Sequence, residues 1–131
     1  MTTLVKVSTL GERLDLELHQ GASLLPVRHT MLDALNAPIN LTGATVRGQI
    51  RRTAVDVTVV AAFRTAIGPT PSLGYYEFWL TDEDTAAITC GPKITDPAST
   101  YEYDIEVENA SGDVRCTFWG TVRVKAGATR P

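Results

Sequence analysis

Hydrophobic and polar residues alternate along most of the chain with a period of two, which is the period of a half-buried β-strand. The alternating runs are found at positions 14–19, 24–31, 44–51, 57–63, 75–80, 101–108 and 114–125. In the second run we expect Leu25, Val27 and Met31 to face the core. Because Pro26 lacks a backbone donor, this strand should lie at a sheet edge or bend at the proline.

The last two runs are predicted to form a hairpin across Ser111-Gly112. A two-residue turn at this point places Glu108 opposite Arg115 and Ile105 opposite Phe118. Acidic residues then face basic residues on the outer side, and apolar residues face each other on the inner side. A slip of one residue would invert both faces, so the hydrophobic pattern specifies this register.

One short helix is predicted to interrupt the strands. Thr81 is a suitable N-cap, acidic residues fill the first turn at 82–84, and Gly91-Pro92 can end the helix. About seven or eight strands with one short helix predict an all-β fold, either a β-sandwich or a partly open barrel. We expect an N-terminal arm or extra strand at 1–12, the β-sandwich domain at 13–125 and a flexible C-terminal tail at 126–131.

The composition is typical of one folded domain. The 131 residues include 12 Lys and Arg against 15 Asp and Glu, and this net charge of -3 argues against a nucleic-acid partner. The apolar runs are much shorter than the roughly 20 residues that span a bilayer, so we expect no membrane partner. Cys90 and Cys116 are expected to be reduced in a cytoplasm, with a single disulfide as the alternative.

The sequence contains no recognisable catalytic or metal-ligand spacing. We interpret His19 and His29 as solvated surface residues, because no third or fourth metal ligand accompanies them. The acidic row at 102–108 is interpreted as the cross-strand partner of Arg115 and Arg123, since a glycosidase needs two opposed carboxylates. We therefore expect a protein that is not an enzyme and has no cofactor and no metal.

Seven residues are candidates for a protein interface: Tyr75, Trp79, Trp119, Arg47, Arg51, Leu4 and Val5. Strand alternation directs the three aromatic residues outward, at least in part, where they would form an interface or a sugar platform. The alternative is that they pack under a loop or helix. The two arginines form a basic outer face, either solvated and balanced by the acidic hairpin or in contact with an acidic partner. The two apolar residues near the N-terminus belong to an extra strand or a docking arm.

Four segments occur in a defined order, at 20–24 (QGASL), 37–51 (APINLTGATVRGQIR), 80–88 (LTDEDTAAI) and 101–107 (YEYDIEV). The Ser111-Gly112 hairpin and Gly120-Thr121-Val122 follow them. This ordered set, over about residues 14–125, resembles small tail and baseplate domains of tailed bacteriophages, including the N-terminal domains of baseplate upper (fibre-adaptor) proteins. The chain departs from their pattern at Asn40, where Asp is commoner, in the longer link at 90–97, and in the added first dozen residues.

The resemblance implies an immunoglobulin-like antiparallel β-sandwich with a structural, non-catalytic role in the virion tail or baseplate. Its expected partners are other tail, baseplate or fibre proteins and further copies of the same chain, after synthesis in the host bacterial cytoplasm. The alternative function is a carbohydrate-binding module, in which Tyr75, Trp79 or Trp119 stacks on the sugar rings of host glycans. A bacterial cell-surface adhesion domain is disfavoured, because the sequence begins without a signal-peptide pattern.

Overall fold

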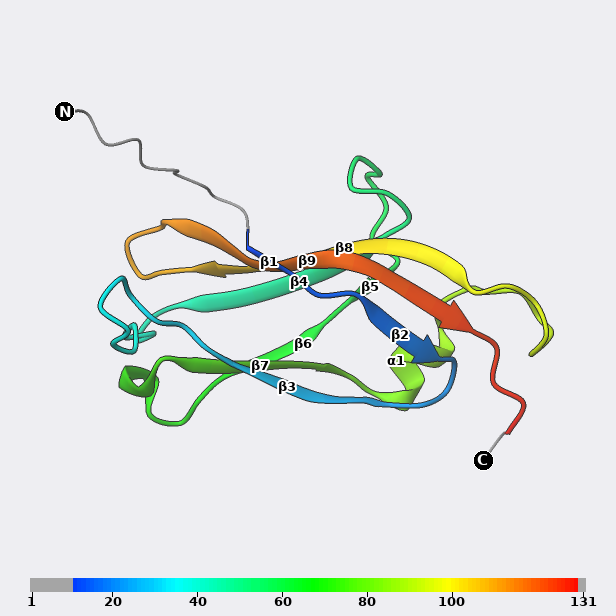
Figure 1. The fold of residues 1–131 in the computed structure, drawn as a ribbon, viewed down its shortest axis with the longest axis horizontal. Coiled ribbons are helices and arrows are strands. Elements are labelled where there is room, and N and C mark those ends of the chain that lie inside the picture. The colour runs from blue at the N-terminus through cyan, green and yellow to red at the C-terminus, as the bar shows by residue number, and fades with distance from the viewer. Residues whose placement is uncertain (1–10, 130–131) are drawn as a thin grey trace.

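Two β-sheets pack face to face in the computed structural model, which describes residues 11–129 (Figure 1). The larger sheet contains, in spatial order, β1 (Glu12–Arg13) and β2 (Leu16–His19) along one edge, then β9 (Val114–Lys125), β8 (Ser99–Glu108), β4 (Thr45–Arg51) and β5 (Ala61–Ala62). The smaller sheet contains β3 (Leu24–Thr30), β7 (Tyr75–Leu80) and β6 (Arg64–Ile67). The described helices are α1 (Asp82–Ala86) and a 3-10 helix, η1 (Pro71–Leu73). Leu4 and Val5, of the expected arm, lie outside the described residues.

The strand order is that of an immunoglobulin-like sandwich, as predicted. β9, β8 and β4 occupy the positions of strands G, F and C, while β3, β7 and β6 occupy those of B, E and D. The hydroxyl of Tyr101, near the start of β8, donates a hydrogen bond to the carbonyl of Thr89, as in the tyrosine corner of this fold. Two pairings differ from the expected antiparallel arrangement, because β1 and β2 both run parallel to β9.

The nine described strands come from seven continuous runs of chain, because two runs are each divided into two strands. β1 and β2 are separated by Leu14 and Asp15 along the same edge of the larger sheet. β5 and β6 are separated only by Phe63, where the chain leaves the larger sheet and joins the smaller one. The predicted number of strands is therefore close to the observed number.

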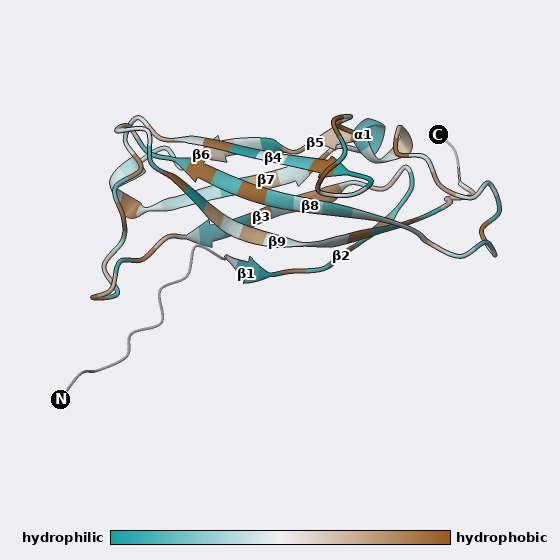
Figure 2. Ribbon diagram, turned by 90° about the horizontal axis from the view of Figure 1, so that it is seen from above, coloured by the Kyte–Doolittle hydropathy of each residue, from teal (hydrophilic) through white to brown (hydrophobic). Residues whose placement is uncertain are grey.

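The core lies between the two sheets and is rich in aromatic residues. Phe78 of β7 has no exposed surface, and its ring centroid lies 5.5 Å from that of Phe63 and 5.9 Å from that of Phe118. Phe63 also contacts Tyr103 of β8, at 5.5 Å between centroids. Hydrophobic and hydrophilic positions alternate along β4 and β8 in Figure 2. One face of these strands therefore supplies the core and the other is left for contacts outside it.

The β8–β9 hairpin has a longer loop than predicted. The backbone N–H of Asn109 donates to Asp113, so the loop has three residues, with Gly112 at φ 94°. Glu108 consequently pairs with Val114, and the predicted pairing of Glu108 with Arg115 is wrong.

A β-bulge further along the hairpin compensates for this shift. Glu106 pairs with Cys116 and Ile105 pairs with Phe118, so Thr117 is an extra residue on β9. The predicted pairing of Ile105 with Phe118 is therefore confirmed. Thr117 is buried, although the strict alternation along this strand predicts that it faces outward.

Residues 52–60 form a loop, although the alternation at 57–63 predicts a strand beginning at Val57. Val57 is 93% exposed, and pairing with β4 begins only at Ala61. A strand needs a hydrogen-bonded neighbour, and β4 pairs here over only two residues. In Figure 1 this loop projects beyond the larger sheet, between β4 and β5.

Two further expectations concern β3 and α1. Pro26 lies on an edge strand and within a bulge between Leu24 and Val27, which confirms both expectations for the proline. The bulge turns Leu25 outward, so its predicted core position is wrong and it is 75% exposed. The helix α1 begins after Thr81 in a capping box, as predicted, but it ends at Ala86, well before Gly91-Pro92.

Candidate functional site

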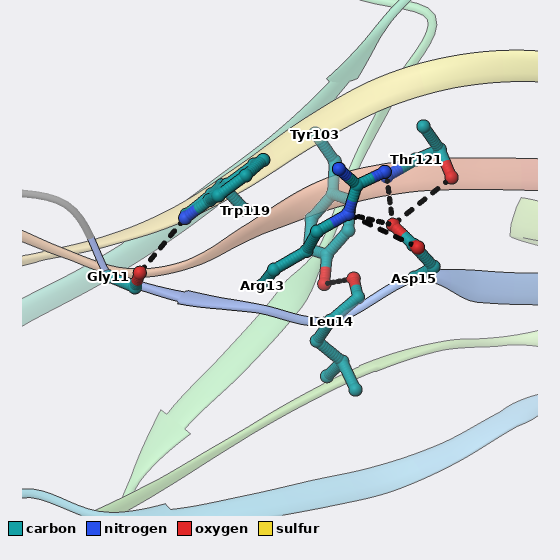
Figure 3. Close-up of polar contacts among 7 residues, drawn as sticks. All are labelled: Gly11, Arg13, Leu14, Asp15, Tyr103, Trp119 and Thr121. Carbon is teal, nitrogen blue, oxygen red and sulfur yellow. Dashed lines mark hydrogen bonds and ion pairs between the residues drawn. The ribbon is translucent and has the colours of Figure 1, made fainter.

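The N-terminal edge strand, which consists of β1 and β2, is held against β9 by side chains as well as by backbone pairing (Figure 3). The backbone N–H of Leu14 donates to the carbonyl of Trp119 at 2.9 Å. One residue later, the Asp15 carboxylate accepts from both the backbone N–H and the hydroxyl of Thr121, at 3.0 and 3.2 Å. The backbone bond from Thr121 holds the pKa of Asp15 below its usual value, and Arg13 adds to this effect at 3.2 Å. Between β1 and β2, the Asp15 carboxylate thus takes the place of a backbone carbonyl as the acceptor for the N–H of Thr121.

Gly120 allows the interrupted edge strand to approach β9 closely. A Cβ atom at this position would lie 2.5 Å from the carbonyl oxygen of Leu14 and 2.7 Å from the carboxylate of Asp15. The Tyr103 hydroxyl donates to the same Leu14 oxygen from the neighbouring strand β8. A glycine is therefore required on β9 beside the break between β1 and β2, where the two backbones approach most closely.

This edge strand also positions Trp119. The indole Nε1 of Trp119 donates to the carbonyl of Gly11 at 2.9 Å, and the guanidinium carbon of Arg13 lies 5.2 Å from its ring centroid. The side chain is half-buried, as the prediction of a partly exposed tryptophan requires. Its partial cover comes from Gly11 and Arg13 at the N-terminal edge of the sheet, whereas the alternative expected cover by a loop or helix.

Trp119 lies in a row of side chains that crosses three strands of the larger sheet. The register places Gln49 of β4 opposite Asp104 of β8, and Asp104 opposite Trp119 of β9. The next row consists of Arg51, Glu102 and Thr121. Together with Arg13, Ala54, Tyr103 and Gly120, these residues line a groove of about 450 Å³.

Most polar groups of this groove are held in place by hydrogen bonds. Arg51 donates to the side-chain oxygen of Gln49 at 2.8 Å and to the carbonyl of Asp56 at 2.7 Å. Glu102 accepts from the backbone N–H of Ala54 at 2.9 Å. In residues 11–129, by contrast, no hydrogen bond or ion pair engages the Asp104 carboxylate. The pKa of Asp104 is raised, mainly because surrounding atoms exclude solvent.

Arg47 lies further along β4 and is neutralised by the acidic strand beside it. Its guanidinium contacts Glu106 at 3.0 Å and Glu108 at 3.7 Å. The interpretation of a solvated face balanced by acidic residues is therefore correct for Arg47. The predicted partners of the acidic row are wrong, because β8 lies next to β4 as well as β9, and Arg123 pairs instead with Glu17 of β2.

Tyr75 and Trp79 lie on the smaller sheet, so the structure separates them from Trp119 and the arginines of β4. Both side chains are half-buried on the outer face of β7. The guanidinium carbon of Arg28 lies 4.2 Å from the Tyr75 ring centroid, and Arg64 pairs opposite Trp79. The candidate aromatic residues thus form two separate surfaces.

His29 is not a solvated surface residue as predicted, because it lies on the inner face of β3. Its ring is half-buried against Phe118, and Nδ1 lies 3.1 Å from the hydroxyl of Tyr76. That hydroxyl contacts the hydroxyl of Thr117 at 2.6 Å, and Thr117 in turn contacts the carbonyl of Ile105 at 3.3 Å. Burial raises the pKa of Tyr76 to about 12, so the chain of hydroxyls stays neutral. His19 is exposed, as expected.

The burial of His29 predicts a loss of stability in mild acid. Burial lowers its pKa below 6.5, so the unfolded chain takes up a proton at this residue before the folded chain does. The free energy of unfolding should therefore fall as the pH decreases from about 7.5 to about 5.5. Urea unfolding at the two pH values measures this change. His29→Gln should reduce it, whereas the exposed control His19→Gln should not, and an equal effect of both variants would contradict the assignment.

Residues 11–129 contain no group of three or more His, Cys, Asp or Glu side chains placed to bind a metal ion. None of the helices within this range reaches the length and hydrophobicity that crossing a membrane requires. Cys90 and Cys116 are free thiols, as expected.

No protein-family model matches the chain, and no curated protein matches it significantly.

Proposed function

We propose that this protein is a non-enzymatic structural component of a bacteriophage tail, baseplate or tail-fibre attachment site, which works through repeated protein–protein contacts. The support is the ordered resemblance to phage tail domains together with a rigid sandwich that presents an apolar loop. Copies of the chain would then be arranged symmetrically in the particle, each in contact with neighbouring tail proteins.

The loop at 52–60 is the observation that carries this proposal. The loop projects beyond the larger sheet (Figure 1). Within it, Val55 and Val57 are 90% and 93% exposed, so two branched apolar side chains of the loop face solvent. Water contact with such a group is unfavourable, and burying one fully gains about 1.5–3 kcal/mol. An apolar hollow on a neighbouring subunit would provide that burial.

The loop is held to the sheet on both sides of Val55, which suits a docking element. Arg51 donates to the carbonyl of Asp56 at 2.7 Å, and the backbone N–H of Ala54 donates to Glu102 at 2.9 Å. The guanidinium carbon of Arg52 lies 5.6 Å from the ring centroid of Tyr101. Because these contacts position the loop before it meets a partner, less ordering entropy is lost on association.

The double variant Val55→Ser/Val57→Ser tests the proposal in assembled particles. We expect its incorporation, measured by quantitative mass spectrometry of purified phage particles, to fall by at least about ten-fold. Its unfolding free energy should stay within about 0.5 kcal/mol of the wild type, because both side chains are exposed. Leu35→Ser is the matched control, since Leu35 is 88% exposed on a different loop.

Three results would contradict the proposal. The first is absence of the wild-type chain from purified particles, together with a monomeric state at high concentration. The second is normal incorporation of the double variant. The third is an equal loss of incorporation for Leu35→Ser, which would show that the effect is not specific to the loop.

A further inference from the structure

We propose that the groove beside Trp119 binds a neutral saccharide. The proposal does not depend on a role in a phage tail, because the groove lies on the outer face of the larger sheet and includes only Ala54 from the loop at 52–60. The groove volume of about 450 Å³ falls within the roughly 300–1,000 Å³ that is usual for small-molecule sites.

Trp119 supplies the apolar wall of this site. One face of a sugar ring carries C–H groups, and an aromatic side chain with an apolar body can cover such a face. The hydrogen bond from Nε1 to Gly11 and the guanidinium of Arg13 hold the indole in place (Figure 3). Since the ring is already oriented, binding costs little side-chain entropy.

The polar lining favours a ligand without net charge. Arg13 and Arg51 carry positive charge, whereas Glu102 and Asp104 carry negative charge, so the groove contains two groups of each sign. A cationic side chain would meet the two arginines, and an anion would meet the two carboxylates. Vicinal hydroxyls of a sugar can both donate and accept, and they can therefore use both kinds of group.

Asp104 is the strongest acceptor available to such hydroxyls. Its carboxylate lies between Gln49 and Trp119, and within residues 11–129 it has no hydrogen-bond or ion-pair partner. Asp104 is exposed to solvent, so its carboxylate is open to a ligand that enters the groove. Ligand hydroxyls would replace water at this carboxylate and donate hydrogen bonds to a charged acceptor.

The first measurement uses the full chain on an array of immobilised neutral and sialylated oligosaccharides, followed by titration with the best free oligosaccharide. Titrations are read from tryptophan fluorescence in a Trp79→Phe background, which leaves Trp119 as the reporter. We expect saturable binding of a neutral glycan with a change in Trp119 emission. The Trp79→Phe change itself should not alter affinity, because Trp79 lies on the other sheet.

Asp104→Asn and Trp119→Ala test whether binding occurs in this groove. Because Trp119→Ala removes the fluorescent reporter, its affinity is measured by isothermal titration calorimetry. Each should weaken binding by about ten- to a hundred-fold, the range expected for losing a charged hydrogen bond or an aromatic contact. Glu106→Gln is the matched control, because it removes a carboxylate from the same strand outside the groove. Asp104→Asn should also leave incorporation into particles unchanged, which separates this proposal from the structural one.

Several outcomes would overturn the saccharide site. These are no binding of any neutral glycan, binding that survives both groove substitutions, and an equal loss with Glu106→Gln. Binding of lysine- or arginine-containing peptides to the groove, without glycan binding, would also overturn it and would assign the groove to a protein partner.

Discussion

Phe78→Ala is expected to lower the free energy of unfolding by about 3–5 kcal/mol. The Phe78 side chain of β7 is fully buried and contacts Phe118, which belongs to the opposite sheet. It also contacts Phe63, where the chain passes from one sheet to the other. Truncation would leave a cavity between two sheets whose backbones are held by hydrogen bonds, so the surroundings can collapse only in part. Since small domains have about 5–15 kcal/mol of stability, much of the total would be lost.

Urea unfolding monitored by circular dichroism measures this effect. Leu25→Ala is a suitable control, because it removes an aliphatic side chain from a strand at a position that is 75% exposed. The control should change the free energy of unfolding by no more than about 0.5 kcal/mol. A loss below about 1 kcal/mol for Phe78→Ala would show that this ring does not join the two sheets as described.

The alternation pattern predicts the central strands well because one face of each is buried. At 101–108 the expected inward residues Tyr101, Tyr103, Ile105 and Val107 are all buried. The same pattern fails at Val57, since alternation is local and a strand also requires a neighbour with which to pair. Where β4 ends, the chain has no such neighbour and forms the projecting loop instead.

The hairpin loop could not be assigned from its residue types alone. Ser111-Gly112 is compatible with a two-residue turn, but the side chain of Asn109 accepts from the backbone N–H groups of Ser111 and Asp113. These contacts stabilise a three-residue loop. The bulge at Thr117 then restores the register that the apolar face requires, so the prediction fails at the tip and is correct further along the strands.

For His29 the alternation pattern indicates an inward position, and the assignment to the surface is wrong. Its position shares a face with Val27 and Met31, both of which were expected to point inward. The lack of further metal ligands argues against a metal site but does not exclude burial, so the surface assignment did not follow from it. The hydroxyl of Tyr76 makes burial possible, because it provides a partner for the ring nitrogen. Such a partner is visible only after β3 and β7 are paired.

Only some residues of the candidate groove could be predicted from the sequence. Trp119 can be identified from its outward position, and the hairpin register places Asp104 opposite it. Gln49 and Arg51 join them through the pairing of β4 with β8, which are about 50 residues apart in the chain. The position of Arg13 depends on a parallel edge strand, and the alternation of residues gives no information about strand direction.

Gly120→Val is expected to detach the N-terminal edge strand from β9. The added Cβ would meet the carbonyl oxygen of Leu14 at 2.5 Å, and this oxygen cannot move without losing its bond from Tyr103. Overpacking of this kind costs about 1–3 kcal/mol, and an unpaired buried hydroxyl adds about 1–3 kcal/mol. Urea unfolding should show the loss of stability, and hydrogen exchange at residues 14–19 should become faster. Lys125→Val, an exposed change on the same strand, should alter neither measurement.

Gly120→Val and Asp104→Asn should both weaken glycan binding, but only Gly120→Val should also lower stability. The comparison separates the placement of Trp119 from the hydrogen bonding of the carboxylate. Gly120→Val should weaken glycan binding together with stability, because the detached edge strand no longer holds Trp119 through Gly11. Asp104→Asn should weaken binding while stability stays within about 0.5 kcal/mol of the wild type, since the side chain is exposed and its carboxylate makes no hydrogen bond or ion pair within residues 11–129. Unchanged exchange at residues 14–19 in Gly120→Val would show that the edge strand tolerates the side chain. In that case the close approach at Gly120 would not be what holds the edge strand against Trp119.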